Sequence, residues 1–179
     1  MGVALSRLRE RIMDKIKIGG IMQSDGRSLL KIMSVPDHVD AAGSVLGGMA
    51  KNGIHIEFLV ESFDLDDNGN FSLVIDQKDL DRAIGILEDI KPAINAKIVS
   101  YVPDVAVITV FGPHLREKPH IHGMMFSAIA SVGIRSLAIS TSISSVSSVV
   151  EARYMDDAIQ ALTGVFDVPF QVKERPKDY

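Results

Sequence analysis

The 179-residue sequence contains no cysteine. The chain therefore cannot form disulfide bonds or use a thiol in catalysis, and only His, Asp and Glu remain as charged or imidazole metal ligands. No apolar run approaches the roughly 20 residues that a membrane span requires, and the N-terminus lacks the apolar core of a secretion signal. Together these absences fit a reducing compartment and predict a cytoplasmic protein.

Basic charge and catalytic motifs are also scarce. The chain has 19 Lys and Arg against 23 Asp and Glu, a net charge of −4, whereas nucleic-acid-binding domains usually show a basic face. The sequence has no nucleophile elbow, no phosphate-binding P-loop and no dinucleotide-binding glycine motif, since Gly47 and Gly48 fall inside a predicted helix. We therefore expect no nucleic-acid partner, no cofactor, no catalytic residue and no enzymatic activity.

What the sequence does contain is an internal repeat. An apolar helical stripe that ends in a glycine occurs twice, 80 positions apart: Val45, Leu46, Met49, Ala50 and Gly53 correspond to Met125, Phe126, Ile129, Ala130 and Gly133. A second pair of stripes, beginning at Leu80 and at Met155, matches at an offset of 75 positions. Self-similarity over this length is too long for a solenoid repeat and predicts two copies of one small domain.

Each copy has the pattern of a strand, a helix, two strands, a helix and a strand. Alternating apolar residues predict the strands, and apolar residues at spacings of three and four predict the helices. In copy one we expect strands over 28–35, 54–62, 71–75 and 96–102, and helices over 41–52 and 80–90. In copy two we expect strands over 104–111, 134–142, 145–152 and 170–173, a helix ending at 133 and a helix over 154–165. This order predicts an α+β fold: two ferredoxin-like βαββαβ domains side by side, each an antiparallel sheet with helices on one face.

The expected domain boundaries follow from the repeat. We place an N-terminal amphipathic helix and a short strand in 1–27, the first domain in 28–102, the second domain in 103–173 and a charged tail in 174–179. The helix is expected over 3–17, where apolar residues repeat at helical spacing among Arg and Lys. We predict that it packs on the body of the protein or on a second subunit.

Three local signals in or near copy one make sharper predictions. Ser24-Asp25-Gly26 predicts a turn, and Asp40 predicts an N-cap for the first helix. Alternation along the second strand predicts that four residues share one buried face. They are Ile54, Ile56, Phe58 and Val60.

Two clusters have some features of metal sites. The segment 64–69 opens like a calcium loop, but its twelfth position is Ile75 instead of the required Glu, and its Asn-Gly pair is a strong hairpin signal. A second cluster contains His114, His120 and His122, but the neighbouring Arg116 and Lys118 would oppose a metal ion. We predict a tight turn at the first cluster, a structural or ligand-contacting role for the histidines, and no metal site.

Two segments resemble a known family of small-molecule-binding domains. Residues 35–62, VPDHVDAAGSVLGGMAKNGIHIEFLVES, are similar to the loop, helix and strand of an ACT domain. Residues 118–142, KPHIHGMMFSAIASVGIRSLAISTS, resemble the second ACT domain of aspartate kinases, including its I-S-T-S strand end. The resemblance covers about residues 28–165, a tandem ACT pair with no kinase domain ahead of it. In the aspartate kinase pattern a strand ahead of the first copy completes the second sheet, and residues 17–23 could supply it.

The resemblance implies a sensor. The ACT domains of aspartate kinases pair across a dimer and bind lysine or threonine at domain interfaces. By this resemblance we expect a homodimer that binds an amino acid or related metabolite and transmits this to a partner such as an enzyme. The expected ligand-binding residues lie at the two strand-to-helix loops, on the next strand of copy one and at the facing strand end of copy two. They are Asp37, His38, Asp40, Ala41, Ala42, His55, Ile56, Glu57, Lys118, His120, Ile121, His122, Arg135, Ser140, Thr141 and Ser142.

Departures from the family pattern leave an alternative open. The loop of the family pattern has Pro-Gly where copy one has Val39-Asp40. The Asp40 carboxylate would repel the carboxylate of a ligand. The alternative to a sensor is therefore a structural or assembly module that has lost ligand binding. In copy two His120 stands in place of the glycine, and together with Lys118 and Arg135 it favours a more anionic ligand.

Overall fold

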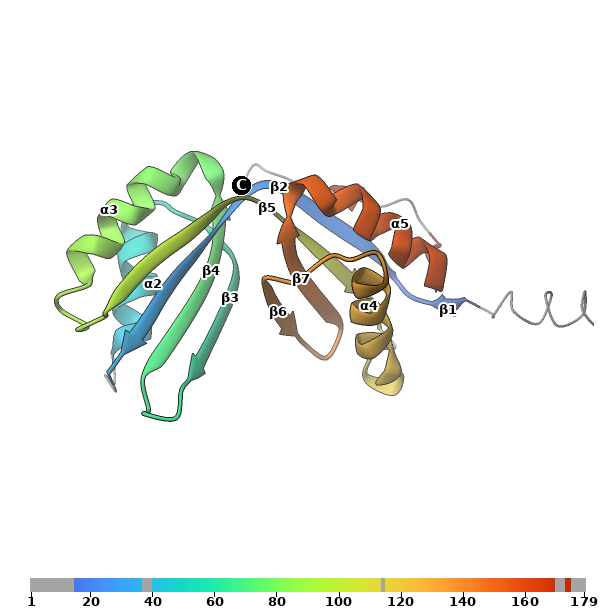
Figure 1. Cartoon of the computed structure of the whole chain (residues 1–179), viewed down its shortest axis with the longest axis horizontal. Helices are drawn as coiled ribbons and strands as arrows, with labels where there is room; N and C mark the ends of the chain where they lie inside the picture. Colours follow the sequence, from blue (N-terminus) through green and yellow to red (C-terminus); the bar gives the residue numbers. More distant parts are fainter. Residues whose placement is uncertain (1–14, 37–39, 114, 170–172, 175–179) are drawn as a thin grey trace, which may run out of the picture.

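The computed structural model of the chain describes residues 15–36, 40–113, 115–169 and 173–174. Figure 1 shows two halves that diverge from a shared bend, each with two helices on its outer side. The helices are α2 (Ala41–Lys51) and α3 (Leu80–Ile90) in the first half and α4 (His120–Ser131) and α5 (Met155–Val165) in the second. The strands are β1 (Ile16–Lys17), β2 (Gly20–Val35), β3 (Ile56–Phe63), β4 (Gly69–Asp76), β5 (Ile98–Phe111), β6 (Ala138–Thr141), β7 (Ser145–Glu151), β8 (Phe166–Asp167) and β9 (Lys173–Glu174). Short 3-10 helices, η1 (Gln77–Asp79), η2 (Leu115–Glu117) and η3 (Ala152–Tyr154), precede α3, α4 and α5.

Two long strands, β2 and β5, run through both halves. The main sheet has the strand order β3-β4-β2-β5-β7-β6. Residues 20–24 of β2 pair with residues 107–111 of β5, whereas residues 29–33 of β2 pair with residues 98–102 of β5. Each half therefore has four antiparallel strands, which confirms the predicted α+β fold of two ferredoxin-like units. The expected domain boundaries after residues 27 and 102 fall inside these two strands.

The fourth strand of the second half comes from the beginning of the chain. The start of β2 lies next to β5 on the side away from β7, so it completes the order β6-β7-β5-β2. This is the position that the strand predicted ahead of copy one would occupy. The predicted N-terminal helix lies outside the described residues except at its end, where Ile16 and Lys17 form β1 and pair with β8.

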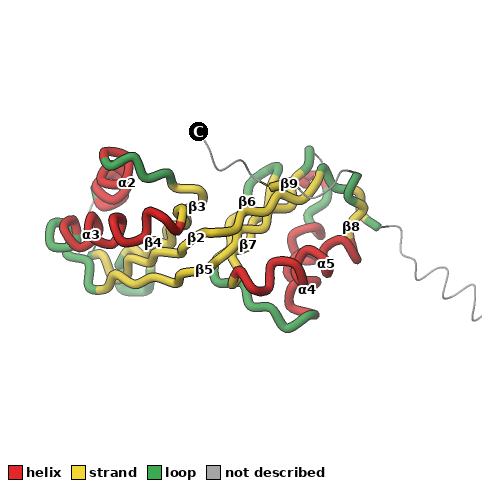
Figure 2. The backbone as a smooth tube through the Cα atoms, turned by 90° about the horizontal axis from the view of Figure 1, so that it is seen from above, coloured by secondary structure: helices red, strands yellow, loops and turns green. Residues whose placement is uncertain are grey.

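The helices cover the outer face of each half, and Figures 1 and 2 show α2 and α3 on one half and α4 and α5 on the other. Apolar side chains under the helices form two separate cores, because each helix turns one stripe toward the sheet. The first core includes Leu30, Val45, Met49, Phe71 and Leu87. The second core includes Ile21, Ile108, Met125, Ile129 and Leu162.

A third apolar cluster lies on the opposite face of the strands, between the two halves. Successive strand residues point to opposite faces, so Leu29 and Leu30 belong to different cores, as do Val107 and Ile108. The cluster also includes Phe58 from β3. Strands β3 and β6 are the two edges of the main sheet. Because the sheet bends at β2 and β5, these edge strands nevertheless lie close to each other (Figure 1).

The turn predicted at Ser24-Asp25-Gly26 is wrong, because these residues lie inside β2. The pairing register with β5 shifts between Ser24 and Arg27, and Gly26 has a φ of 60°. A left-handed residue and an irregular register bend a strand without ending it. The signal for a chain reversal therefore marks the bend between the halves.

The single buried face predicted for β3 is also wrong. Ile56 pairs with Ile75 and Phe58 pairs with Val74, so Glu57 is an extra residue in the ladder. This bulge reverses the faces: Ile56 packs against the first core and Phe58 belongs to the cluster between the halves.

Two other local predictions have different outcomes. Asp40 is at the N-cap position of α2, but its side chain makes no cap hydrogen bond. The predicted tight turn is present between β3 and β4, where the Asp64 carboxylate accepts hydrogen bonds from the backbone N–H groups of Asp66 (2.9 Å) and Asn68 (3.0 Å). Within the described ranges, no helix is both long and apolar enough to cross a membrane.

Candidate functional site

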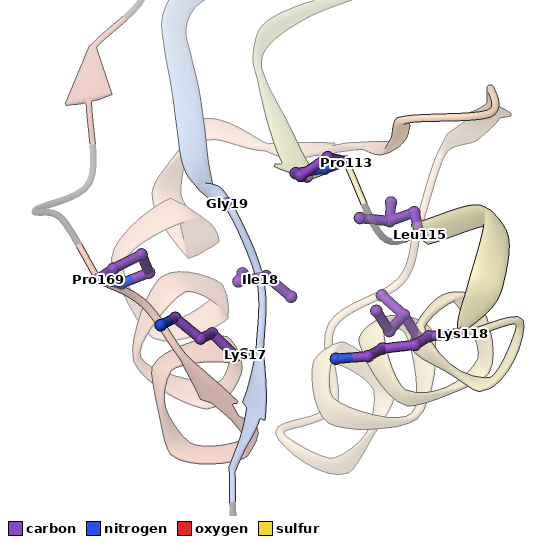
Figure 3. Close-up of a pocket in the computed structure, with 9 residues that line it drawn as sticks. Lys17, Ile18, Gly19, Pro113, Leu115, Lys118 and Pro169 are labelled. Carbon is purple, nitrogen blue, oxygen red and sulfur yellow. The ribbon is translucent and has the colours of Figure 1, made fainter.

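A pocket of about 450 Å³ lies in the second half, where β5 leads toward α4 (Figure 3). One wall is the segment 17–19, which joins β1 to β2. The other wall is formed by the loop after β5 and the first turn of α4, with Pro169 near the opposite end. The pocket thus brings together the beginning, middle and end of the described chain.

Two glycines let these walls meet. The Gly19 N–H donates to the Phe111 carbonyl oxygen at 2.8 Å, and the Gly112 N–H donates to the Ser144 carbonyl oxygen at 2.9 Å. A Cβ atom on Gly19 would lie 2.8 Å from the Phe111 oxygen and 2.9 Å from the Gly112 Cα atom. Such distances to backbone atoms are too short for any side chain, so glycine is required for this close approach.

The pocket is apolar at its base and positively charged at its sides. Ile18, Leu115 and Ile121 line it and are only 4%, 1% and 0% exposed. Figure 3 shows the Lys118 ammonium group pointing toward the strand segment with Ile18, and the Lys17 side chain pointing toward Pro169. No Asp or Glu is among the described residues that line it. A pocket of this kind suits a small molecule with an apolar body and an anionic group.

The start of α4 adds to the positive character of this region. The first turn contains no acidic residue, and Pro119 at the N-cap provides no side-chain cap. Helix beginnings carry a partial positive charge from their backbone N–H groups. The first turn of α4 therefore supplies no carboxylate to neutralise the positive charge at the pocket.

The structure places the predicted residues of copy two in two different places. Lys118 and Ile121 line the pocket, and exposed His120 begins α4 beside them. His122 is partly exposed, with its Nδ1 atom 3.3 Å from the Pro119 carbonyl oxygen. Arg135 follows the far end of α4, which has 12 residues and is roughly 18 Å long. Arg135 and Lys118 are therefore not brought together.

The predicted residues of copy one surround the start of α2 and the start of β3. Asp40 is exposed, and its Oδ2 atom accepts a hydrogen bond from the Ser44 hydroxyl at 3.5 Å. Ala41 is buried and Ala42 is partly buried, while His55 is exposed between α2 and β3. Asp37 and His38 lie outside the described residues. A carboxylate thus stands at the start of α2, in contrast to α4.

Glu57 is engaged in an ion pair with Arg27. The Arg27 Nε atom donates to Glu57 Oε2 at 2.5 Å, and its Nη1 atom donates to Asp76 Oδ2 at 3.3 Å. The side chains of Arg27 and Glu57 are 7% and 11% exposed. The bulge at Glu57 directs this carboxylate to the bend of β2, where it neutralises a buried guanidinium.

The serine-rich strand end lies at the turn between β6 and β7. Ser142 accepts hydrogen bonds from the backbone N–H groups of Ser145 (3.0 Å) and Ser144 (3.3 Å), so it stabilises the turn. Ser140 and Thr141 are in β6, which lies close to β3. The structure therefore brings this strand near the one that holds Ile56 and Glu57, but the pocket is elsewhere.

Sequence reasoning missed the wall that contains Lys17 and Gly19. The available signal was the glycine pair 19–20 ahead of a strand and Gly112 at the end of another, because adjacent glycines often mark close backbone contacts. The pairing of these two strands joins residues 20 and 111. Local periodicity cannot predict a contact between residues so far apart in the sequence.

Comparison with known proteins places this geometry in context. Residues 108–166 match the ACT domain family. An aspartate kinase from Pseudomonas putida is 28% identical over 167 residues, which cover 93% of this chain and 41% of that protein. An aspartokinase from Thermus thermophilus is 25% identical over 158 residues, which cover 87% of this chain and 38% of that protein. The chain thus spans about two fifths of the length of the curated relatives it matches.

Solved structures share the fold. The ligand-free regulatory subunit of aspartate kinase from Thermus thermophilus has a TM-score of 0.76 at 22% identity, covering 84% of this chain and 99% of that chain. Aspartate kinase from Synechocystis has a TM-score of 0.82 at 24% identity, covering 90% of this chain and 28% of that chain. Residues 108–166 thus match an ACT domain, and the chain as a whole resembles the tandem ACT region of the aspartate kinases.

Proposed function

We propose that the chain is a non-catalytic regulatory unit that binds a small metabolite, an amino acid or a related organic acid, and transmits the binding to a partner protein. The observation that carries this proposal is the pocket at the strand-to-helix loop of the second half. Five of its lining residues fall within the segment that matches the ACT domain family, including Lys118 and Ile121, two residues predicted to contact a ligand.

The names of the relatives support a regulatory role. The curated relatives are aspartate kinases, and one solved structure that shares the fold is the regulatory subunit of such an enzyme. By analogy, the partner is an aspartate kinase catalytic unit, and the regulatory unit acts as a homodimer in the cytoplasm. The analogy also favours an effector rather than a substrate as the bound molecule.

The shared strands suggest how binding is transmitted. Residues 17–19 form a wall of the pocket and continue directly into β2, which crosses into the first half. A ligand that fits one position of this wall better than another shifts the population of the two arrangements. Couplings of this kind typically amount to about 1–3 kcal/mol, a change of roughly five- to 150-fold in affinity for the partner.

A metabolite screen by thermal unfolding tests the proposal. A ligand at 100 times its dissociation constant adds about 2.7 kcal/mol to the free energy of unfolding, which raises the melting temperature by several degrees in a chain of this size. The compounds that raise it are then tested against an aspartate kinase mixed with the purified chain. If no amino acid or organic acid changes the melting temperature, the sensor proposal is refuted.

The second candidate is an assembly module without a ligand. It is favoured by Asp40, whose carboxylate stands at the start of α2 and opposes a bound anion there. This candidate predicts that the chain changes the oligomeric state or stability of a partner enzyme equally with and without metabolites. Size-exclusion chromatography of the mixed proteins, with and without each compound, distinguishes the two.

A further inference from the structure

We propose that the pocket between residues 17–19 and the start of α4 selects organic acids that lack an ammonium group over the corresponding amino acids. The inference rests on the proposed function and narrows its ligand to one chemical class. That class comprises 2-oxo acids and simple carboxylates with a short apolar body. It follows from the charges and the burial of the residues that line the pocket.

The charged lining residues are both cations. Lys17 and Lys118 provide the formal charges, and no carboxylate side chain is present among the described lining residues. The carboxylate of either ligand class would be attracted to these ammonium groups. The α-ammonium of an amino acid would meet no acidic partner among these described lining residues and would be repelled by the same lysines. The pocket therefore distinguishes two molecules that differ only at the α-carbon.

The base of the pocket accommodates a short hydrocarbon body. Ile18, Leu115 and Ile121 are buried at the pocket and offer no charged group. The volume of about 450 Å³ falls within the range of small-molecule sites, roughly 300–1,000 Å³. The combination of an apolar base with cations at the sides favours an amphiphilic anion over inorganic phosphate, which cannot use the apolar surface.

The two lysines have different positions. Lys118 extends from the loop before α4 toward the strand segment, whereas Lys17 is directed to the side of Pro169 (Figure 3). We assign the main carboxylate contact to Lys118, because its ammonium group points across the pocket. Lys17 supplies additional positive potential and a contact for a second carboxylate in a longer dicarboxylic acid.

The first half provides an internal contrast. Its helix α2 begins with the Asp40 carboxylate, whereas the first turn of α4 contains no acidic residue. Repulsion by the Asp40 carboxylate would weaken the binding of an anion at the start of α2. The selectivity for an anion is therefore assigned to the second half alone.

Isothermal titration calorimetry of the full chain with two matched pairs of compounds tests this inference. The pairs are 2-oxoglutarate with glutamate and 4-methyl-2-oxopentanoate with leucine, so the members of each pair differ only at the α-carbon, which carries a carbonyl oxygen in one and an ammonium group in the other. We expect the oxo acid of at least one pair to bind at least about tenfold more tightly than its amino acid, as expected for removal of an unpaired like charge. Lys118→Met should weaken that binding at least about tenfold and reduce its dependence on salt.

Lys51→Met is the matched control, because Lys51 is exposed in the last turn of α2 in the other half. It should leave the dissociation constant unchanged, and circular dichroism should show that both variants fold. If an amino acid binds more tightly than its oxo acid, or if Lys118→Met has no effect, the inference is overturned while the proposed sensor remains. If neither the four compounds nor the wider metabolite screen produces binding, both the inference and the proposed function fail.

Discussion

Arg27 is a buried cation at the bend of β2, and replacing it with methionine tests how much its ion pairs with β3 and β4 stabilise the fold. Its guanidinium contacts Glu57 at 2.5 Å and Asp76 at 3.3 Å. Methionine keeps much of the apolar stem and removes the charge. The Glu57 carboxylate, only 11% exposed, would lose the guanidinium that neutralises it.

The expected cost is set by the burial of the partners. Removing one member of a buried ion pair typically destabilises a protein by about 3–5 kcal/mol. Asp76 is 26% exposed and also lies 3.6 Å from the Lys78 Nζ atom, so it retains water and a second cation. We expect Arg27→Met to lower the free energy of unfolding by about 3 kcal/mol, because the Arg27 and Glu57 side chains are both nearly buried.

Urea unfolding followed by circular dichroism measures this change. The control is Arg82→Met, because Arg82 is 53% exposed in its ion pair with Asp79, and exposed pairs contribute about 1 kcal/mol or less. Adding Glu57→Gln to Arg27→Met also removes the carboxylate that faced the guanidinium, so the double variant should be more stable than the sum of the two single losses implies. If Arg27→Met costs no more than Arg82→Met, our description of the bend is refuted.

Three further predictions concern the pocket wall, the second core and the turn after β3. Gly19→Ala should destabilise the chain by about 1–3 kcal/mol in urea unfolding, because the new Cβ atom would meet backbone atoms. Its control is Gly85→Ala, at an exposed position of α3 where a Cβ atom would have no neighbour within 4 Å, and this variant should be neutral or stabilising by up to about 1 kcal/mol. Leu162→Ala should cost about 2–5 kcal/mol because the side chain is fully buried, whereas Ile143→Ala at 71% exposure should stay within about 0.5 kcal/mol. The hydrogen bond from the Asn68 backbone N–H group, with further hydrogen bonds from the Asn68 side chain and the Asp66 backbone, holds the pKa of Asp64 below its ordinary value although desolvation acts in the opposite direction. A lowered pKa in the folded state favours folding at pH values above the unfolded pKa of about 4 and loses this effect as the pH falls through the folded pKa; an NMR titration in which the Asp64 carboxylate titrates at or above its ordinary pKa would contradict this.

The elements of each repeat could be predicted because they depend on local periodicity. The stripes that contain Met49 and Met125 predicted α2 and α4, and both methionines are fully buried. The hairpin after β3 followed from Asp64 to Gly69, whose side-chain and backbone groups bond within the same six residues. Sequence analysis was sufficient where the residues that determine an element lie within a few positions of one another.

The features that depend on distant partners could not be predicted. The alternation expected along β3 describes a regular strand, whereas β3 has a bulge at Glu57, whose carboxylate bonds to Arg27, 30 positions earlier in the chain. Ser24-Asp25-Gly26 has the composition of a turn, but Ser24 pairs with Val107 and Arg27 with Val105 on β5, so the segment stays within β2. In the same way, Lys118 and Ile121 were suggested by the family resemblance, whereas Lys17 enters the pocket through long-range strand pairing.

The strands that pass through both halves make the internal duplication difficult to undo. A fragment that begins at residue 103 would lack the strand that residues 20–24 supply to its sheet. A fragment that ends at residue 102 would leave the same residues without a neighbour, and unpaired strand edges promote aggregation. Neither repeat is self-sufficient, so the two are expected to be inherited together and to melt in one cooperative transition.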